Sequence, residues 1–170
     1  MKHVFVFDPD RCCACSACMI GCIDQNDIDV EQNELCFRKT FDTEVLRADG
    51  STYCAYISAA CMHCVDAPCI AACPVGCLRK DPETGFTIYD NTNCIGCKSC
   101  AMACPFGAPR YRASDGKMVK CDGCNIRVKN GLKPACVRSC SFGALDCVTE
   151  EEYQASGSQK ACNYLLKKVP

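Results

Sequence analysis

The sequence predicts a small α+β fold made of two related halves, in which short helices alternate with β-hairpins. Three observations support this prediction. Sixteen of the 22 cysteines fall into four groups with regular spacing. A similar turn ends three of the groups, as CPVG at 73–76, CPFG at 104–107 and CSFG at 140–143, which indicates an internal duplication. Stretches of alternating apolar and polar residues flank the groups, as expected for β-strands.

The four cysteine groups have the spacing of ligands to cubane iron–sulfur clusters. The first and third groups read C-x2-C-x2-C-x3-C, the ligand run of bacterial ferredoxins. The second group lengthens one gap by two residues, and the fourth inserts eleven residues between its second and third cysteines. In order along the sequence, the groups are Cys12, Cys15, Cys18 and Cys22; Cys61, Cys64, Cys69 and Cys73; Cys94, Cys97, Cys100 and Cys104; and Cys121, Cys124, Cys136 and Cys140.

The fourth cysteine of each group is expected to serve a neighbouring cluster. In two-cluster ferredoxins the fourth cysteine of each run ligates the other cluster, because a short helix carries it away from its own loop. Proline and glycine after that cysteine then end the helix and reverse the chain. Each pair of groups therefore forms one interlocked, bacterial-ferredoxin-like module that holds two clusters. Spacing alone leaves the pairing open, because the third and fourth groups are also close in sequence.

The alternating stretches predict where the strands lie. Residues 2–7, KHVFVF, form a strand that enters the first cysteine loop, and residues 144–148 are its expected partner. Residues 35–58 alternate around the ADGS sequence at 48–51 and predict a hairpin inserted between the first two groups. Two shorter hairpins are expected around residues 82–85 and 114–116.

Two segments near the C-terminal end of the sequence are rich in polar residues. Residues 125–135 predict a polar loop or short helix within the fourth group, whose basic residues either face solvent or damp the negative charge of the thiolates. The tail begins acidic at residue 150 and turns apolar at 161–166. It predicts either a helix that docks on a partner or a frayed terminus.

The composition limits the possible partners and the size of the apolar core. A formal net charge of −1 argues neither for nucleic acid nor for an anionic membrane surface as a partner, and no nucleic acid is expected. Leucine, isoleucine, valine and phenylalanine make up about 19% of the 170 residues, which is a low share for a packed core. Metal–ligand bonds are therefore expected to supply part of the folding free energy.

Disulfides and zinc are the two other uses of so many cysteines. A disulfide framework belongs to secreted proteins, and neither a signal peptide nor an apolar run of membrane-spanning length is visible. Zinc also binds CxxC pairs. Zinc ribbons need two such pairs, however, whereas CxxCxxC triplets recur here. Iron–sulfur clusters are favoured over both alternatives.

Several residues near the groups invite a second interpretation. Cys13 adjoins Cys12 and competes with it as a ligand, although only Cys12 fits the CxxCxxC frame. His63, inside the second group, has a structural role, hydrogen-bonds a sulfur or gates a proton, and the structural role is favoured. The remaining cysteines outside the groups are expected to be small buried hydrophobic residues, namely Cys36, Cys54, Cys77, Cys147 and Cys162. Basic residues that flank the groups are candidates for tuning cluster potentials, namely Arg11, Lys98, Arg110, Arg112 and Lys120.

Four segments give the sequence a specific family resemblance. They are YISAACMHC at 56–64, CIGCKSC at 94–100, CPFGAP at 104–109 and CDGC at 121–124. Together with the four cysteine groups, they resemble the four-cluster iron–sulfur (beta) subunits of the dimethyl sulfoxide reductase family of molybdopterin oxidoreductases. The likeness extends from about residue 2 to residue 148.

The resemblance implies how the groups pair, because in that family the first pairs with the fourth and the second with the third. The implied ligand sets are Cys12, Cys15, Cys18 and Cys140 for cluster 1; Cys121, Cys124, Cys136 and Cys22 for cluster 2; Cys61, Cys64, Cys69 and Cys104 for cluster 3; and Cys94, Cys97, Cys100 and Cys73 for cluster 4. Some relatives carry tryptophan at the place of Cys97 and hold a three-iron cluster there. Cys97 therefore implies that all four are [4Fe-4S] clusters.

The same resemblance implies the division of the polypeptide. Residues 1–34 and 115–150 form a discontinuous outer module with the first and fourth groups. The hairpin at 35–58 and a central module at 59–114, with the second and third groups, are inserted into it. Residues 151–170 form a C-terminal tail.

The implied function is electron transfer without catalysis. Irons closed by four cysteines leave no open coordination position for a substrate. By resemblance, the protein passes electrons between a donor and a large molybdopterin (Mo or W) catalytic subunit in an anaerobic reductase complex. The donor side is a membrane anchor, a quinol-oxidising subunit or a soluble protein. The alternatives are a free-standing polyferredoxin and the equivalent subunit of a formate dehydrogenase or hydrogenase. The expected location is the cytoplasm, or the membrane or an exported complex reached only together with the catalytic partner.

Overall fold

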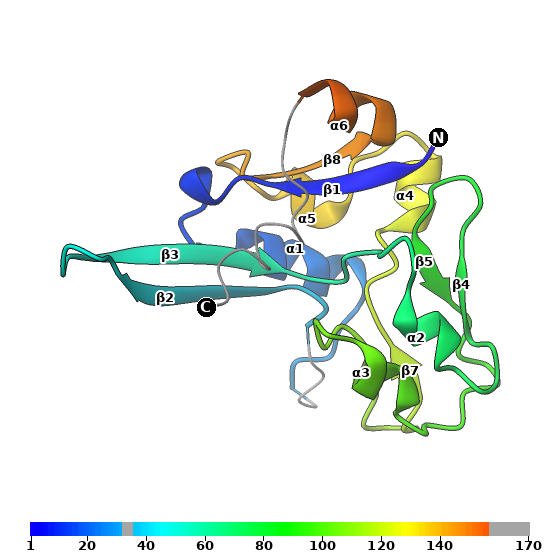
Figure 1. Cartoon of the computed structure of the whole chain (residues 1–170). Helices are drawn as coiled ribbons and strands as arrows, with labels where there is room; N and C mark the ends of the chain where they lie inside the picture. The colour runs from blue at the N-terminus through cyan, green and yellow to red at the C-terminus, as the bar shows by residue number, and fades with distance from the viewer. Residues whose placement is uncertain (32–35, 157–170) are drawn as a thin grey trace.

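The computed structural model describes residues 1–31 and 36–156 of the protein. Within these ranges the polypeptide forms antiparallel two-stranded ribbons and mostly short helices (Figure 1). The strands are β1 (His3–Phe7), β2 (Lys39–Leu46), β3 (Thr52–Ala59), β4 (Leu78–Lys80), β5 (Thr87–Tyr89), β6 (Arg110–Tyr111), β7 (Met118–Val119) and β8 (Leu145–Thr149). The helices are the 3-10 helix η1 (Pro9–Arg11), α1 (Ala17–Gln25), α2 (Pro68–Ala71), α3 (Ser99–Ala103), α4 (Asn125–Lys129), α5 (Ala135–Arg138) and α6 (Glu150–Ser156). The predicted α+β class is confirmed.

Strands β1 and β8 lie side by side, although they are far apart in the sequence (Figure 1). Their antiparallel register runs from His3 opposite Thr149 to Phe7 opposite Leu145, which confirms the strand pair predicted from the sequence. Phe7 and Leu145 are buried at the inner end of this ribbon in a core cluster that also contains Cys18 and Cys136. The ribbon therefore closes over the helices that carry cysteines of the first and fourth groups.

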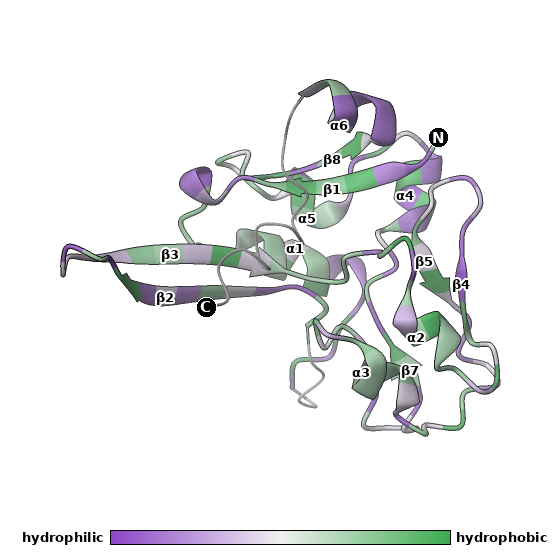
Figure 2. Cartoon of the chain, viewed as in Figure 1, coloured by the Kyte–Doolittle hydropathy of each residue, from purple (hydrophilic) through white to green (hydrophobic). Residues whose placement is uncertain are grey.

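The hairpin predicted between the first two groups is confirmed as the ribbon β2–β3, which projects from the body of the molecule (Figure 1). Much of β2 is hydrophilic and exposed (Figure 2). Ala55 of β3 is buried, whereas its neighbour Cys54 is exposed. The expectation that Cys54 is a buried residue is therefore wrong, because successive side chains of a strand point to opposite faces.

The two short hairpins predicted around 82–85 and 114–116 are confirmed as β4–β5 and β6–β7. A buried carboxylate fastens the turn of the first to α4. Asp81 accepts hydrogen bonds from the Thr84 backbone N–H and the Asn125 side-chain amide, both at 3.0 Å, and forms a 2.7 Å ion pair with Lys129. Burial raises the pKa of Asp81, but these partners more than offset that effect and hold the pKa well below its usual range. Asp81 is therefore charged at neutral pH.

The helices pack in two pairs, α1 with α5 and α2 with α3. A β-carbon at Gly21 of α1 would overlap the Ser139 hydroxyl, so the first pair approaches this closely only because residue 21 has no side chain. Cys69 of α2 and Cys100 of α3 belong to a second core cluster, together with Leu78 and Met118. Each pair thus brings cysteines of two sequence groups next to each other.

The segments after Cys121 settle the remaining expectations about secondary structure. Helix α4 is the short helix predicted as one alternative for 125–135. Helix α6 is hydrophilic and has no buried residue (Figure 2), while the apolar stretch at 161–166 lies outside the described residues. No helix in the described part of the protein has the length and apolar character that crossing a membrane requires.

Candidate iron–sulfur sites

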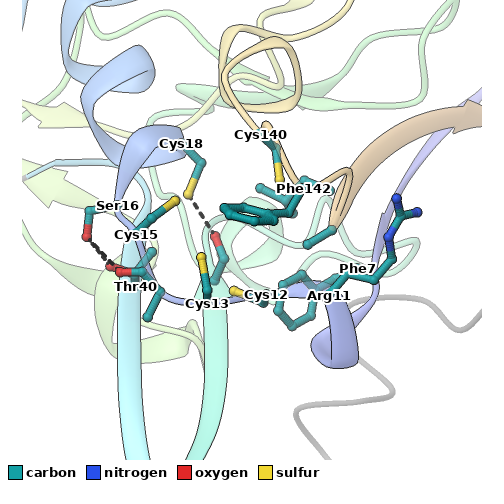
Figure 3. Close-up of a pocket in the computed structure, with 14 residues that line it drawn as sticks. Phe7, Arg11, Cys12, Cys13, Cys15, Ser16, Cys18, Thr40, Cys140 and Phe142 are labelled. Atoms are coloured by element: carbon teal, nitrogen blue, oxygen red, sulfur yellow. Dashed lines mark hydrogen bonds between the residues drawn. The ribbon is translucent and has the colours of Figure 1, made fainter.

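Cysteines from the first and fourth groups surround one cavity at the inner end of the β1–β8 ribbon (Figure 3). Three come from the loop before α1 and its first turn, and one comes from the turn after α5, namely Cys12, Cys15, Cys18 and Cys140. Apolar side chains such as Phe7, Phe142 and Leu145 form much of the remaining wall of the cavity. The site is therefore a thiol-lined pocket in largely apolar surroundings.

Two further cavities are lined by cysteines of the second and third groups. One is surrounded by Cys61, Cys64, Cys69 and Cys104. The other is surrounded by Cys94, Cys97, Cys100 and Cys73. In each cavity, three cysteines of one group meet the fourth cysteine of the other group. This exchange is the one that two-cluster ferredoxins use.

The remaining cysteines, Cys22, Cys121, Cys124 and Cys136, interact with one another through their charges. A hydrogen bond with Cys36, burial, and the thiols of Cys121 and Cys136 raise the pKa of Cys22. Burial and the Cys136 thiol raise the pKa of Cys124. Around each of three cavities, three cysteines of one group thus lie together with the fourth cysteine of another group. The assignment of all sixteen cysteines to four ligand sets stays a prediction.

Backbone N–H groups donate hydrogen bonds to cysteine sulfurs in these loops. The pairs are Cys77 to Cys73 (3.2 Å), Met118 to Cys94 (3.3 Å), Ala108 to Cys104 (3.4 Å) and Gly123 to Cys121 (3.4 Å). Several non-glycine residues of the loops adopt left-handed backbone conformations, namely Ala14, Ser16, His63, Lys98 and Cys124. Hydrogen bonds to sulfur orient thiolate ligands and stabilise their charge. The residues present therefore fit an iron–sulfur cluster.

A single metal ion such as zinc is the other inorganic group that thiols can hold. Among the described residues, no three histidine, cysteine or acidic side chains lie close enough together to hold one ion. A zinc site requires four ligand atoms within about 2.3 Å of the metal, so its sulfurs are in mutual contact. The preference for a multi-iron cluster over zinc rests on the CxxCxxC triplets that recur in the sequence.

A buried arginine and a serine from the inserted hairpin also reach the cysteines. The Ser58 hydroxyl lies 3.3 Å from Cys18 Sγ and accepts a 3.0 Å hydrogen bond from Arg38, which is only 4% exposed. Burial lowers the pKa of Arg38, but the thiols of Cys136, Cys121 and Cys18 more than offset this and raise it. Neither residue stands out in the sequence, because neither lies in a cysteine group.

His63 and Lys120 are buried between the sets of cysteines. The His63 ring accepts a 3.0 Å hydrogen bond at Nδ1 from the Thr87 backbone N–H. Burial and the charges of Lys120, Lys80 and Arg38 lower the pKa of His63 well below its usual range, so the ring is neutral. Of the basic residues singled out in the sequence, Lys120 is almost fully buried, whereas Arg112 forms an exposed ion pair with Asp115.

The cysteines outside the four groups occupy different positions. Cys36 and Cys77 are buried, as expected. Cys77 lines the cavity built on the third group, and Cys13, which is exposed, lines the one built on the first. Cys147 is half-buried against the first core cluster, and Cys162 lies outside the described residues.

Three features define the class of the protein. The fold is a small one of mixed helices and strands. Pairs of packed short helices bring together cysteines from two groups, and backbone N–H groups donate hydrogen bonds to the sulfurs. Together these features are those of a ferredoxin-like iron–sulfur protein.

Known proteins place the polypeptide more closely. A family model described as a 4Fe-4S dicluster domain matches residues 52–150. The B subunit of anaerobic dimethyl sulfoxide reductase from Haemophilus influenzae is 39% identical over 168 residues, which span 94% of this protein and 80% of that subunit. The subunit of the same name from Escherichia coli (strain K12) is 41% identical over 154 residues, or 85% of this protein and 72% of that subunit. The formate dehydrogenase iron–sulfur subunit of H. influenzae is 31% identical over 172 residues, which span 93% of this protein and 55% of that subunit.

The polypeptide therefore belongs to the 4Fe-4S dicluster family, among the iron–sulfur subunits of the dimethyl sulfoxide reductase family. It is an iron–sulfur electron-transfer subunit of the kind found in oxidoreductase complexes. The family resemblance found in the sequence is confirmed.

Proposed function

We propose that the protein binds four [4Fe-4S] clusters through the four sets of cysteines described above. The observation that carries this proposal is the exchange of cysteines, in which three from one group meet the fourth from another around each of three cavities. The ferredoxin-type spacing and the N–H donors to sulfur support it further. Bound clusters of this type supply one-electron redox chemistry.

The two helix pairs are the centres of two ferredoxin-like modules in this proposal. The pair α1–α5 belongs to the outer module, residues 1–34 and 115–150, and the pair α2–α3 to the central module, residues 59–114. The existence of two separate core clusters, one around each pair, supports the division. The hairpin of residues 35–58 joins the modules and supplies Arg38 and Ser58 to the outer one.

The protein has no catalytic site of its own in this proposal. All four ligands of each proposed cluster are cysteines, so no iron retains a position for a substrate. The polypeptide contributes by holding the thiolates in place, by surrounding them with apolar walls and by donating hydrogen bonds to sulfur, which together adjust the redox potentials.

Replacing two adjacent cysteines tests the ligand assignment. We expect Cys12→Ser to lose or convert one cluster, because Cys12 occupies the first position of the CxxCxxC frame. Cys13→Ser is the matched control and should keep about sixteen irons per molecule, four for each cubane. Iron analysis and electron paramagnetic resonance (EPR) of the anaerobically reduced proteins measure the difference.

The opposite result, with iron lost only from Cys13→Ser, would move the ligand to Cys13, which lines the same cavity. Far fewer than about sixteen irons in the unaltered folded protein would reject the four-cluster proposal itself.

We propose a large molybdopterin subunit as the partner that carries out the reaction. The likeness to the B subunit of anaerobic dimethyl sulfoxide reductase over most of both sequences supports this assignment. The cavity of Cys12 would face that partner, and the exposed Phe142 and Cys15 at its rim suit a protein contact. Purification of the tagged full-length protein from anaerobically grown cells should recover a large subunit that contains a molybdopterin.

Two other outcomes of that purification would point elsewhere. A stable lone monomer would favour a free-standing polyferredoxin. A catalytic subunit that oxidises formate would favour the second candidate, the equivalent subunit of a formate dehydrogenase, which the relative of that name supports at lower identity.

A further inference from the structure

Two buried side chains cross between the second and fourth cysteine groups. His63 belongs to the loop of the second group, yet its Nε2 lies 3.8 Å from Cys121 Sγ of the fourth group. Lys120 precedes Cys121, yet its Nζ lies 3.7 Å from Cys61 Sγ of the second group. Each group therefore supplies a polar side chain to a sulfur of the other group.

The hydrogen-bond partners of both side chains show that they are donors to sulfur. Because His63 Nδ1 accepts the Thr87 N–H, the ring donates from Nε2, which faces Cys121 Sγ. The Lys120 ammonium carries three protons. Two of these protons are donated to the carbonyl oxygens of Thr87 (2.5 Å) and Cys121 (2.6 Å). The third remains for Cys61 Sγ.

The space between the two groups is closed to water. Lys120 is 1% exposed, and Phe86, which is 0% exposed, packs against the His63 ring with their centres 4.7 Å apart. Phe5 stacks on His63 from the β1 strand, with ring centres 5.8 Å apart. A hydrogen bond or a charge acts more strongly in such a place than in water, because the surrounding dielectric constant is low.

We propose that His63 and Lys120 link the two modules and raise the reduction potentials of two clusters, the one held by Cys61 and the one held by Cys121. This inference rests on the proposed function. Reduction adds one negative charge to a cluster, and donors to its sulfurs stabilise the reduced form. Lys120 acts on the cluster held by Cys61, and His63 acts on the cluster held by Cys121. Each module thus adjusts the potential of the other module's cluster.

Potentiometric titration followed by EPR tests the junction in the complete protein. We expect Lys120→Met to lower the potential of the Cys61 cluster most, with at least a tenfold loss in the equilibrium constant for its reduction, or about 59 mV for a one-electron couple. His63→Asn should lower the potential of the Cys121 cluster by less, because it removes one ring N–H donor and no ammonium group. Asparagine tolerates the left-handed backbone of residue 63 but is too short to reach the sulfur.

Matched variants separate this role from a structural one. Lys133 lies within the fourth group, but its side chain is 62% exposed and pairs with Asp146. Lys133→Met should therefore leave all four potentials unchanged. The potentials of the clusters held by Cys12 and Cys94 should also stay unchanged in Lys120→Met and His63→Asn. Lys120→Gln keeps a donor without the charge, and it replaces Lys120→Met in the titration if the latter loses iron.

Two results would overturn the inference. One is that the potentials of the clusters held by Cys61 and Cys121 are unchanged in both variants. The other is that all four clusters shift equally. Failure of the proposed function itself looks different, since the unaltered protein would then lack four clusters before any substitution.

Discussion

Removal of iron from the folded protein is expected to abolish most of its secondary structure. Large aliphatic residues and phenylalanine are scarce in the sequence, and cysteines take the place of such residues inside the molecule. Cys69 and Cys100 are half of the second core cluster, and Cys18 and Cys136 belong to the first. A domain of this size is stable by about 5–15 kcal/mol, and a single structural metal site in a small domain contributes on the order of 10 kcal/mol. The loss of the proposed clusters would therefore exceed the net stability of a domain of this size.

Far-ultraviolet circular dichroism before and after anaerobic removal of iron measures this effect. Reconstitution with ferrous iron and sulfide under reducing conditions should restore the spectrum, which shows that the loss was due to the metal and not to oxidation of cysteines. A cluster-free protein with a native-like spectrum would show that the polypeptide folds on its apolar core alone.

Gly123→Ala is expected to destabilise the folded protein strongly. Gly123 has a φ of +77°, and a β-carbon there would lie 2.5 Å from Cδ2 of Phe86, which is fully buried. The left-handed backbone costs an alanine about 1–2 kcal/mol, and overpacking a core costs about 1–3 kcal/mol more. The Gly123 N–H also donates to Cys121 Sγ, so any shift of the loop moves a proposed ligand. We expect a loss of about 2–5 kcal/mol in the free energy of unfolding.

Gly131→Ala is the matched control for this prediction. Gly131 has a similar φ of +72°, but a β-carbon at that position meets nothing within 4 Å. The free energy of unfolding of Gly131→Ala should therefore fall only by the cost of the left-handed backbone, about 1–2 kcal/mol. Anaerobic guanidinium unfolding of the iron-loaded proteins, followed by visible absorbance, compares the two. An equal loss of unfolding free energy in both variants would mean that Phe86 moves aside without cost and does not hold the loop in place.

The hairpins were predictable from the sequence because their information is local. The ADGS turn at 48–51 lies between two alternating stretches that need only each other to pair, and the structure pairs Leu46 with Thr52 across it. The same holds for the short hairpins around 82–85 and 114–116. Burial on the ribbon was less predictable, as Cys54 shows, because a ribbon that projects from the molecule has few neighbours to cover either face.

The character of the protein follows from the sequence alone, since the spacing of thiols that suits a cubane cluster is set within short loops of about ten residues. The spacing left the pairing of the groups open, and the packing of α1 on α5 and of α2 on α3 brings Cys140 to the cavity of Cys12 and Cys104 to that of Cys61. Only tertiary structure, likewise, places His63 against Cys121 and Lys120 against Cys61, across 58 and 59 residues of sequence. Contacts over such separations depend on how distant segments fill one water-free space, and no local pattern of residues records that.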